Sequence, residues 1–267
     1  MQSIYLSIEV KAVKDLVKSE LSRIFARKKT VVFLTIFMIL TILDSMFIHF
    51  FGQVIFNRHG VSAPLTQHNF PVALGKEIFL FLHFFIFPIL FIDSFSGELS
   101  DGSYRFVMTK PVSRMHLLFS KWLSQIIITL LFFAIVIVIA YGYSFLFIES
   151  ITATMFLHPT KVYSPIESFL FTMIFYGLLF LISCCVLMIA SFVAFYIHPI
   201  ISYVVTVGMM VIPVLIHKNL WFFILPGEEV LRIVHERDVT FLILTMFIIT
   251  VGLLVNSFAW NKRDIYL

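Results

Sequence analysis

The residues best suited to chemistry at a protein contact gather in one short segment between two apolar stretches. Acidic and basic side chains are interspersed along it: Glu98, Asp101, Arg105, Lys110 and Arg114. Gly102 permits a tight turn, Pro111 disfavours a helical Lys110, and Ser113 is suited to cap a helix that begins after it. We therefore predict that residues 96–121 form a compact charged elbow that is able to contact a partner through charged side chains.

Signatures of catalysis are absent from the sequence. A phosphate-binding loop requires Gly-x-x-x-x-Gly-Lys-Ser/Thr, but Gly75-Lys76 has Phe70 at the position of the first glycine. His235-Glu236 begins a His-Glu-x-x-His zinc pattern that fails at Val239. No Gly-x-Ser-x-Gly nucleophile elbow occurs. We therefore predict no catalytic residue, no metal site and no cofactor in this chain, and hence no enzyme.

Asp44 is an acidic residue expected within the membrane. It follows Lys29 by 15 residues, which is about 22 Å along a helix and places it in the outer part of the bilayer. A carboxylate that faces lipid costs a few kcal/mol, so Asp44 should face the protein interior or a cavity. Two interpretations are open. Asp44, Thr41 and Ser45 line a substrate path or a subunit interface, or Asp44 is a helix-end acid stabilised by headgroups or by these two hydroxyls.

The amino-acid composition indicates that the helices carrying these residues lie in a membrane. Of 267 residues, 60% are hydrophobic and 13% are charged, against about 25% charged in soluble domains. A soluble fold of this size cannot bury so much apolar surface. A spanning helix needs about 20 mostly apolar residues, and six runs approach or exceed this length: Thr30–Phe51, Ile78–Phe95, Trp122–Ile148, Phe169–Phe195, Ile200–Ile216 and Val239–Trp260. The sequence predicts an all-α integral membrane protein with about six transmembrane helices.

The shortest connection lies between the fourth and fifth runs, where Pro199 disfavours a helical His198 and so predicts a turn. The distribution of positive charge favours cytoplasmic termini, because lysine and arginine concentrate in cytoplasmic loops. With both termini inside, 13 of these residues are cytoplasmic and six are outside, the latter being Arg58, Lys76, Lys161, Lys218, Arg232 and Arg237. We therefore predict a multi-pass protein of the cell membrane.

The predicted transmembrane domain spans residues 30–260, and one amphipathic segment precedes it while another lies within it. Residues 1–29 combine helically spaced apolar residues with lysines on the opposite side, which is typical of an interfacial helix whose apolar face meets lipid. Packing against another subunit is the alternative. Residues 217–238 predict a short amphipathic helix at the outer surface, and residues 261–267 form a cytoplasmic tail.

Several of these features resemble one known family. Glu98-x-x-x-Gly102-Ser103, then Pro111-Val112-Ser113-Arg114 and Lys121, resembles the signature that follows the second span in ABC transporter permeases of the type 2 exporter class. The ending Phe258-Ala-Trp-Asn-Lys262-Arg263-Asp264 and the amphipathic N-terminal helix are similar to those of the same family. Together these resemblances touch the whole length of the chain.

The resemblance implies that the elbow is a coupling helix docked on a separate ABC ATPase chain, which binds ATP and Mg. The implied coupling residues are Glu98, Asp101, Gly102, Arg105, Pro111 and Arg114. From the residues alone, the simpler interpretation is that these charges are solvated in a loop and set the membrane topology. With the resemblance, docking of the elbow on an ATPase is favoured. The other expected partners are a second permease copy or a homologous permease and the lipid bilayer, but no nucleic acid. A non-catalytic membrane scaffold or sensor subunit is the alternative function.

Overall fold

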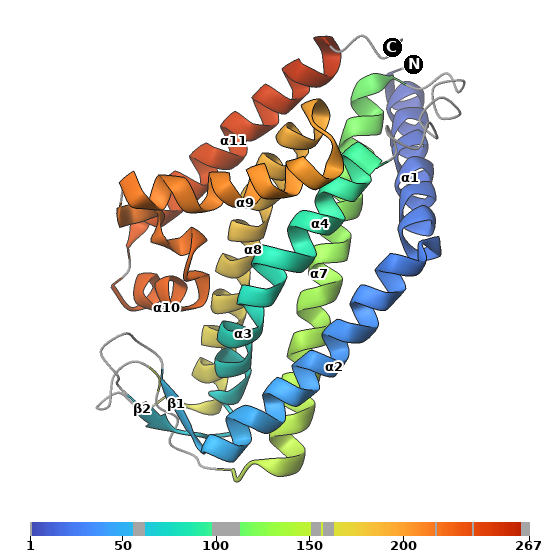
Figure 1. Ribbon diagram of the computed structural model, residues 1–267. Coiled ribbons are helices and arrows are strands. Elements are labelled where there is room, and N and C mark those ends of the chain that lie inside the picture. Colours follow the sequence, from blue (N-terminus) through green and yellow to red (C-terminus); the bar gives the residue numbers. More distant parts are fainter. Residues whose placement is uncertain are drawn as a thin grey trace.

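The computed structural model describes residues 2–55, 62–97, 113–150, 156, 163–216, 218–236 and 238–262. In these residues the chain is predominantly helical, and its long helices form one elongated bundle (Figure 1). Five helical stretches are long and apolar enough to cross a membrane: α2 (Lys28–Phe51), Phe70–Ser96, α7 (Arg114–Phe147), α8 (Pro165–Tyr196) and α11 (Val239–Lys262). A sixth apolar helix, α9 (Pro199–Ile216), is shorter. The prediction of an all-α membrane protein is confirmed.

The bundle has two ends, which we name by what they hold. At one end α1 (Gln2–Ala26) begins and α11 finishes, and we call this the terminal end (Figure 1). At the opposite, far end, the chain leaves α2 through β1 (Gln53–Ile55) and returns through β2 (Ser62–Pro64). These strands form an antiparallel pair in which Val54 lies opposite Ala63.

The second spanning stretch contains two π-helical segments. It runs through α3 (Phe70–Phe81), η1 (Leu82–Ile86), α4 (Phe87–Ile92) and η2 (Asp93–Gly97). Pro88 has no backbone N–H, so the carbonyl of Phe84 lacks its usual helical donor. The hydroxyl of Tyr203 in α9 donates to that carbonyl at 3.1 Å. Because lipid offers no substitute donor, this hydrogen bond satisfies the carbonyl of Phe84 and joins η1 to α9.

This stretch begins earlier than the sequence predicted. It starts at Phe70 rather than Ile78, so Lys76 lies within α3 and not in an outer connection. Lys76 is buried, and its Nζ atom lies 3.4 Å from Glu77 and 3.6 Å from Glu228. The neighbouring carboxylates compensate the buried ammonium group, which explains how the helix tolerates a charge that lowers its hydropathy.

Helix ends agree with the local sequence. Ser113 caps α7 as predicted, because its Oγ atom accepts a hydrogen bond from the backbone N–H of His116 at 3.3 Å. The predicted turn before Pro199 is confirmed, with α8 ending at Tyr196 and α9 beginning at the proline. The helix predicted after the elbow and the third span are one continuous helix of 34 residues.

The far end is held by close packing between helices. A Cβ atom at Gly75 would lie only 2.5 Å from the hydroxyl oxygen of Tyr176, so α3 approaches α8 at a position where only glycine fits without adjustment. The same hydroxyl donates to the carbonyl of Pro71 at 2.9 Å. Tyr176 therefore both fills the interface and satisfies a buried backbone group.

The outer amphipathic segment folds back onto the bundle. It comprises η3 (Lys218–Phe223) and α10 (Pro226–Glu236), and α10 packs against α3 and α8. Its apolar residues Val230, Leu231 and Ile233 are buried in this contact region. His83, which is fully buried, donates from Nε2 to the carbonyl of Phe223 at 2.9 Å. The helix predicted here is present, and its apolar face covers protein.

The N-terminal helix also contacts the bundle directly. Val17 and Ile24, which lie on the face expected to meet lipid, are buried, and α1 packs chiefly against α7. Phe25 remains exposed. Part of the apolar face of α1 therefore belongs to the protein core.

Candidate functional site

The charged elbow is flanked by two described elements at the terminal end of the bundle. Its central residues Glu98, Asp101, Gly102, Arg105 and Pro111 lie outside the described residues. The chain enters the elbow from η2 and leaves it at Arg114, the first residue of α7. The structure therefore shows how the two flanks are held, and these flanks are the candidate site.

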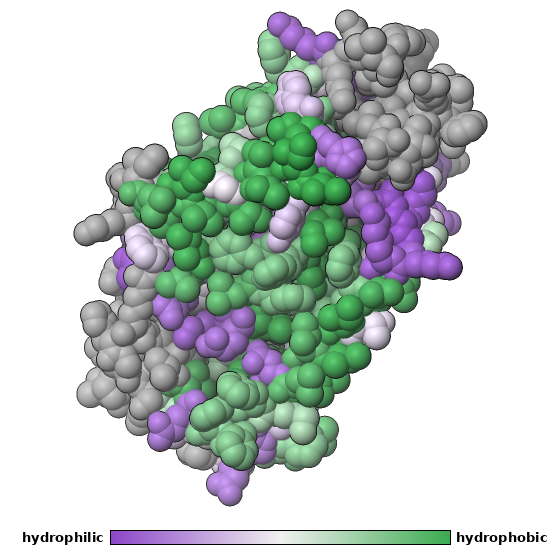
Figure 2. Space-filling model, viewed as in Figure 1, coloured by the Kyte–Doolittle hydropathy of each residue, from purple (hydrophilic) through white to green (hydrophobic). Residues whose placement is uncertain are grey.

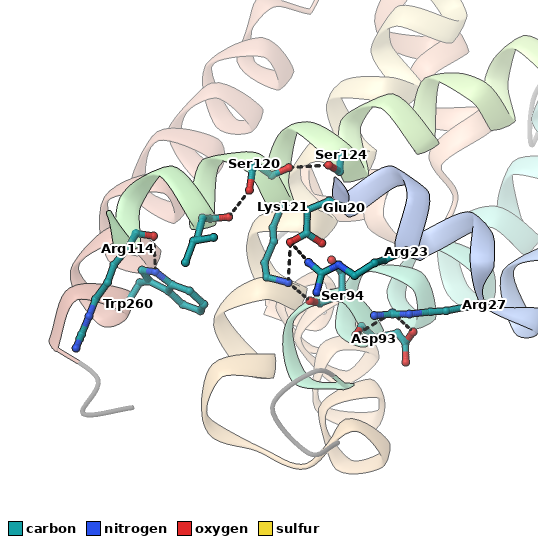
Figure 3. A network of polar contacts seen from close by, with 11 residues as sticks. Glu20, Arg23, Arg27, Asp93, Ser94, Arg114, Ser120, Lys121, Ser124 and Trp260 are labelled. Carbon is teal, nitrogen blue, oxygen red and sulfur yellow. Dashed lines mark hydrogen bonds and ion pairs between the residues drawn. The ribbon is translucent and has the colours of Figure 1, made fainter. Parts of the chain in front are cut away.

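A buried ion pair joins α1 to the beginning of α7 (Figure 3). Lys121 and Glu20 are 2% and 3% exposed, and the Nζ and Oε1 atoms are 3.6 Å apart. Lys121 also donates to the carbonyl of Ser94 in η2 at 2.8 Å. Arg23 contacts the carboxylate of Glu20 from the next turn of α1. One ammonium group thus connects three elements. Loss of Lys121 would remove the partner of Glu20 on α7 and leave its contact with Arg23 within α1.

A second group of charges joins the start of α2 to η2. Asp93 accepts a hydrogen bond from Arg27 through Oδ2 at 2.5 Å, and it also forms an ion pair with Lys29. Arg27 precedes α2 as its N-cap residue, so the bend between α1 and α2 is fixed to η2 at this point. These side chains are more exposed than Glu20 and Lys121, so solvent screens their attraction. We call Glu20, Arg23, Arg27, Lys29, Asp93 and Lys121 the terminal polar cluster.

The other flank of the elbow is attached to the C-terminal helix. The indole Nε1 of Trp260 in α11 donates to the carbonyl of Arg114 at 2.8 Å, as Figure 3 shows. Trp260 is almost fully buried, and its ring centroid lies 5.0 Å from that of Phe195 in α8. The first turn of α7 is thereby anchored to α8 and α11, while Lys121 anchors its second and third turns to α1 and η2.

This arrangement fixes the described flanks of the elbow to the helical bundle. Among the described residues, no group of three or more histidine, cysteine, aspartate or glutamate side chains is placed to bind a metal ion. The cluster fixes both flanks of the elbow to helices that span the bundle. A displacement of the elbow would therefore act on α1, α2, α7 and α11 together.

The sequence matches the model of the ABC-2 family transporter proteins over residues 10–226. The chain belongs to this family. It is therefore a membrane subunit of an ABC transporter, of a kind that is generally non-catalytic and associates with ABC ATPase subunits. The matched range includes the elbow and most of α1, whereas the ending at Phe258–Asp264 lies beyond it. Among curated proteins, none matches the chain.

Asp44, which the sequence suggested for a substrate path or a subunit interface in this ABC-2 subunit, lies toward the far end. It lines a cleft of about 280 Å³ together with Gln53 and Glu77. Its Oδ2 atom is buried without a hydrogen-bond partner among the described residues. The hydroxyls of Thr41 and Ser45 are buried and donate to the carbonyls four residues earlier, at 2.8 Å each. These two hydroxyls therefore satisfy the backbone of α2 and do not pair with Asp44.

The sequence reasoning missed Glu20 and the pairing of Asp93. A signal for Glu20 exists, because it lies three residues after Val17 and four before Ile24, on the apolar face of α1. An acidic residue on such a face requires a buried cation. Asp93 and Arg27 are distant in sequence, and hydropathy alone gives no indication that the two meet.

Proposed function

We propose that this chain is the permease half of an ABC exporter, with both termini in the cytoplasm of the cell, and that the elbow at residues 96–121 docks on a separate ATPase chain. The terminal polar cluster is the observation that carries this proposal. It ties both flanks of a charged connection to the helices of the membrane domain, as a coupling element requires. ATP-driven closure of two ATPases would then move the elbow and, through it, the permease helices.

Family membership supports this proposal, because an ABC-2 membrane subunit requires an ATPase to drive transport. The described flanks of the elbow, in η2 and at the start of α7, lie at the same end as the start of α1 and the last turn of α11. The partner permease in this proposal is a second copy or a homologous chain. Asp44 and its cleft line the path or the permease interface toward the opposite side of the membrane.

Site-specific photo-crosslinking in cells tests the docking. A crosslinking amino acid replaces Ser103 in the elbow in one variant and the exposed Gln53 at the far end in a second. We expect the Ser103 variant to yield an adduct with a nucleotide-binding chain, identified by mass spectrometry, and the Gln53 variant to yield none. An ATPase adduct at Gln53, or none at either position, would overturn the proposal.

A further inference from the structure

A groove opens beside the terminal polar cluster, where α2 begins, α4 ends and α9 begins. Its volume is about 310 Å³, at the lower limit of the range for small-ligand pockets, about 300–1,000 Å³. Apolar side chains, among them Ile92, Ile200 and Val204, form its walls, and Lys29 and Asp93 form its polar end. The hydroxyl of Tyr203 is already bonded to Phe84. A ligand therefore meets an apolar wall along most of the groove and charge at one end.

The polar end carries an excess of positive charge. The terminal polar cluster and the adjacent Lys28 contain five cations, Arg23, Arg27, Lys28, Lys29 and Lys121, against the two carboxylates of Glu20 and Asp93. Asp93 already forms ion pairs with both Arg27 and Lys29. The side chain of Lys29 is 53% exposed, so it is accessible from outside the protein. This end of the groove is thus complementary to an anion.

The apolar walls face outward from membrane helices. Ile200 and Val204 are exposed on α9, and Lys29 stands in the first turn of the spanning helix α2. Figure 2 shows hydrophilic side chains gathered over the junction of α1 and α2, next to hydrophobic surface over α4 and α9. Long basic side chains at such a junction reach the headgroup layer, and basic pockets between spanning helices bind lipid headgroups.

We propose that this groove binds an anionic phospholipid of the leaflet at the terminal end. The lipid phosphate pairs with Lys29 and Arg27 in competition with Asp93, and one acyl chain lies along Ile92, Ile200 and Val204. A free phosphate ion would gain nothing from the walls, and a zwitterionic lipid would carry its own cation to the basic end. Occupancy of the groove would thereby depend on the lipid composition of the leaflet, and the bound lipid would contact residues beside the elbow.

Native mass spectrometry of the purified full chain tests this proposal with phosphatidylglycerol and phosphatidylcholine of identical acyl chains. We expect preferential binding of phosphatidylglycerol. Lys29→Gln should lower that preference about fivefold, as expected for one basic residue near a membrane surface. Asp93→Asn should raise it, because the competing carboxylate is lost. Lys28→Gln makes the same charge change at a residue that does not line the groove, and it should have a much smaller effect.

Two further measurements separate the lipid from other sources of phosphate. Val204→Trp fills the groove without changing charge and should reduce phosphatidylglycerol binding, with a melting curve to confirm folding. Inorganic phosphate at the same concentration should not displace the lipid. Equal binding of the two lipids, equal effects of Lys28→Gln and Lys29→Gln, or displacement by inorganic phosphate would each overturn the proposal. The Lys29→Gln and Asp93→Asn changes act in opposite directions, so a general loss of folding cannot imitate both.

Discussion

The two ends of the bundle differ in how completely their buried acids are paired, although buried Lys76 beside Gly75 is compensated by Glu77 and Glu228. At the terminal end, Glu20 and Lys121 are both buried and compensate each other. At the far end, close packing of Gly75 against Tyr176 holds the helices, and the Oδ2 atom of Asp44 has no hydrogen-bond partner in the described part of the chain. A paired acid in a membrane protein stabilises an assembly of helices, whereas an acid that lacks such pairing is retained at a cost and indicates function.

The largest expected effect comes from breaking the buried pair at the terminal end. Lys121→Met leaves the carboxylate of Glu20 buried without its partner on α7, and such a change costs about 3–5 kcal/mol. We expect a large fall in the melting temperature of the purified protein. Lys18→Met, which removes an exposed lysine from α1, is the control and should change the melting temperature little.

A double variant sharpens this test. Glu20→Leu combined with Lys121→Met removes both buried charges and should recover part of the stability that the single change loses, because Arg23, which then lacks Glu20, is partly exposed to solvent. Equal melting temperatures for the single variant and the Lys18→Met control would show that the pair does not hold α1 to α7.

At the far end, Gly75→Ala tests whether packing has the role that charge has at the terminal end. The added methyl group would lie 2.5 Å from the Tyr176 hydroxyl oxygen and 3.2 Å from Cε1 of Phe175. Overpacking of this kind costs about 1–3 kcal/mol, to be measured as a loss of thermal stability. Gly177→Ala is a matched control, since its methyl group would meet no atom within 4 Å. Equal results for the two alanine variants would contradict the close approach of α3 and α8.

Asp93→Asn should have a smaller effect, because its ion pairs with Arg27 and Lys29 are partly exposed. We expect a loss of about 1 kcal/mol at low ionic strength. Salt at about 1 M should reduce that loss, whereas the loss caused by Lys121→Met should persist because the pair is buried. Melting curves at low and high salt measure both. A salt-independent loss for Asp93→Asn would place this pair among the buried ones.

The smallest effect on stability is expected for Asp44→Asn. The isosteric amide removes a carboxylate that lacks a partner at Oδ2, so we expect the free energy of unfolding to change by less than about 0.5 kcal/mol. Glu77→Gln, on the opposite wall of the cleft, serves as the comparison. A loss as large as that of Lys121→Met would show that Asp44 is paired, and the contrast between the two ends would disappear.

Local sequence predicted much of the fold. The spans follow from apolar length, the cap at Ser113 from a hydroxyl placed before a helix, and the turn before Pro199 from the steric demand of proline. These features depend on neighbouring residues alone. The prediction of where the second span starts was wrong, because Lys76 lowers the local hydropathy. Its partner Glu228 lies in α10, far along the chain.

The candidate site was predicted only in part. The charged composition of the elbow identified the region, and Arg114 does begin α7 as expected. The contacts that hold it require knowing which helix faces meet, and hydropathy does not specify this. Glu20 contacts Lys121 only because α1 lies alongside α7, and Asp93 contacts Arg27 only because η2 lies beside the start of α2.

The length of α7 has a geometric consequence. Its 34 residues extend about 51 Å at about 1.5 Å per residue, whereas the hydrocarbon layer is about 30 Å thick. Even at a tilt of about 40°, near the upper limit for spanning helices, the rod projects about 39 Å along the membrane normal. The helix is therefore longer than the hydrocarbon layer even when it is strongly tilted, so part of it must lie in the headgroup region or beyond.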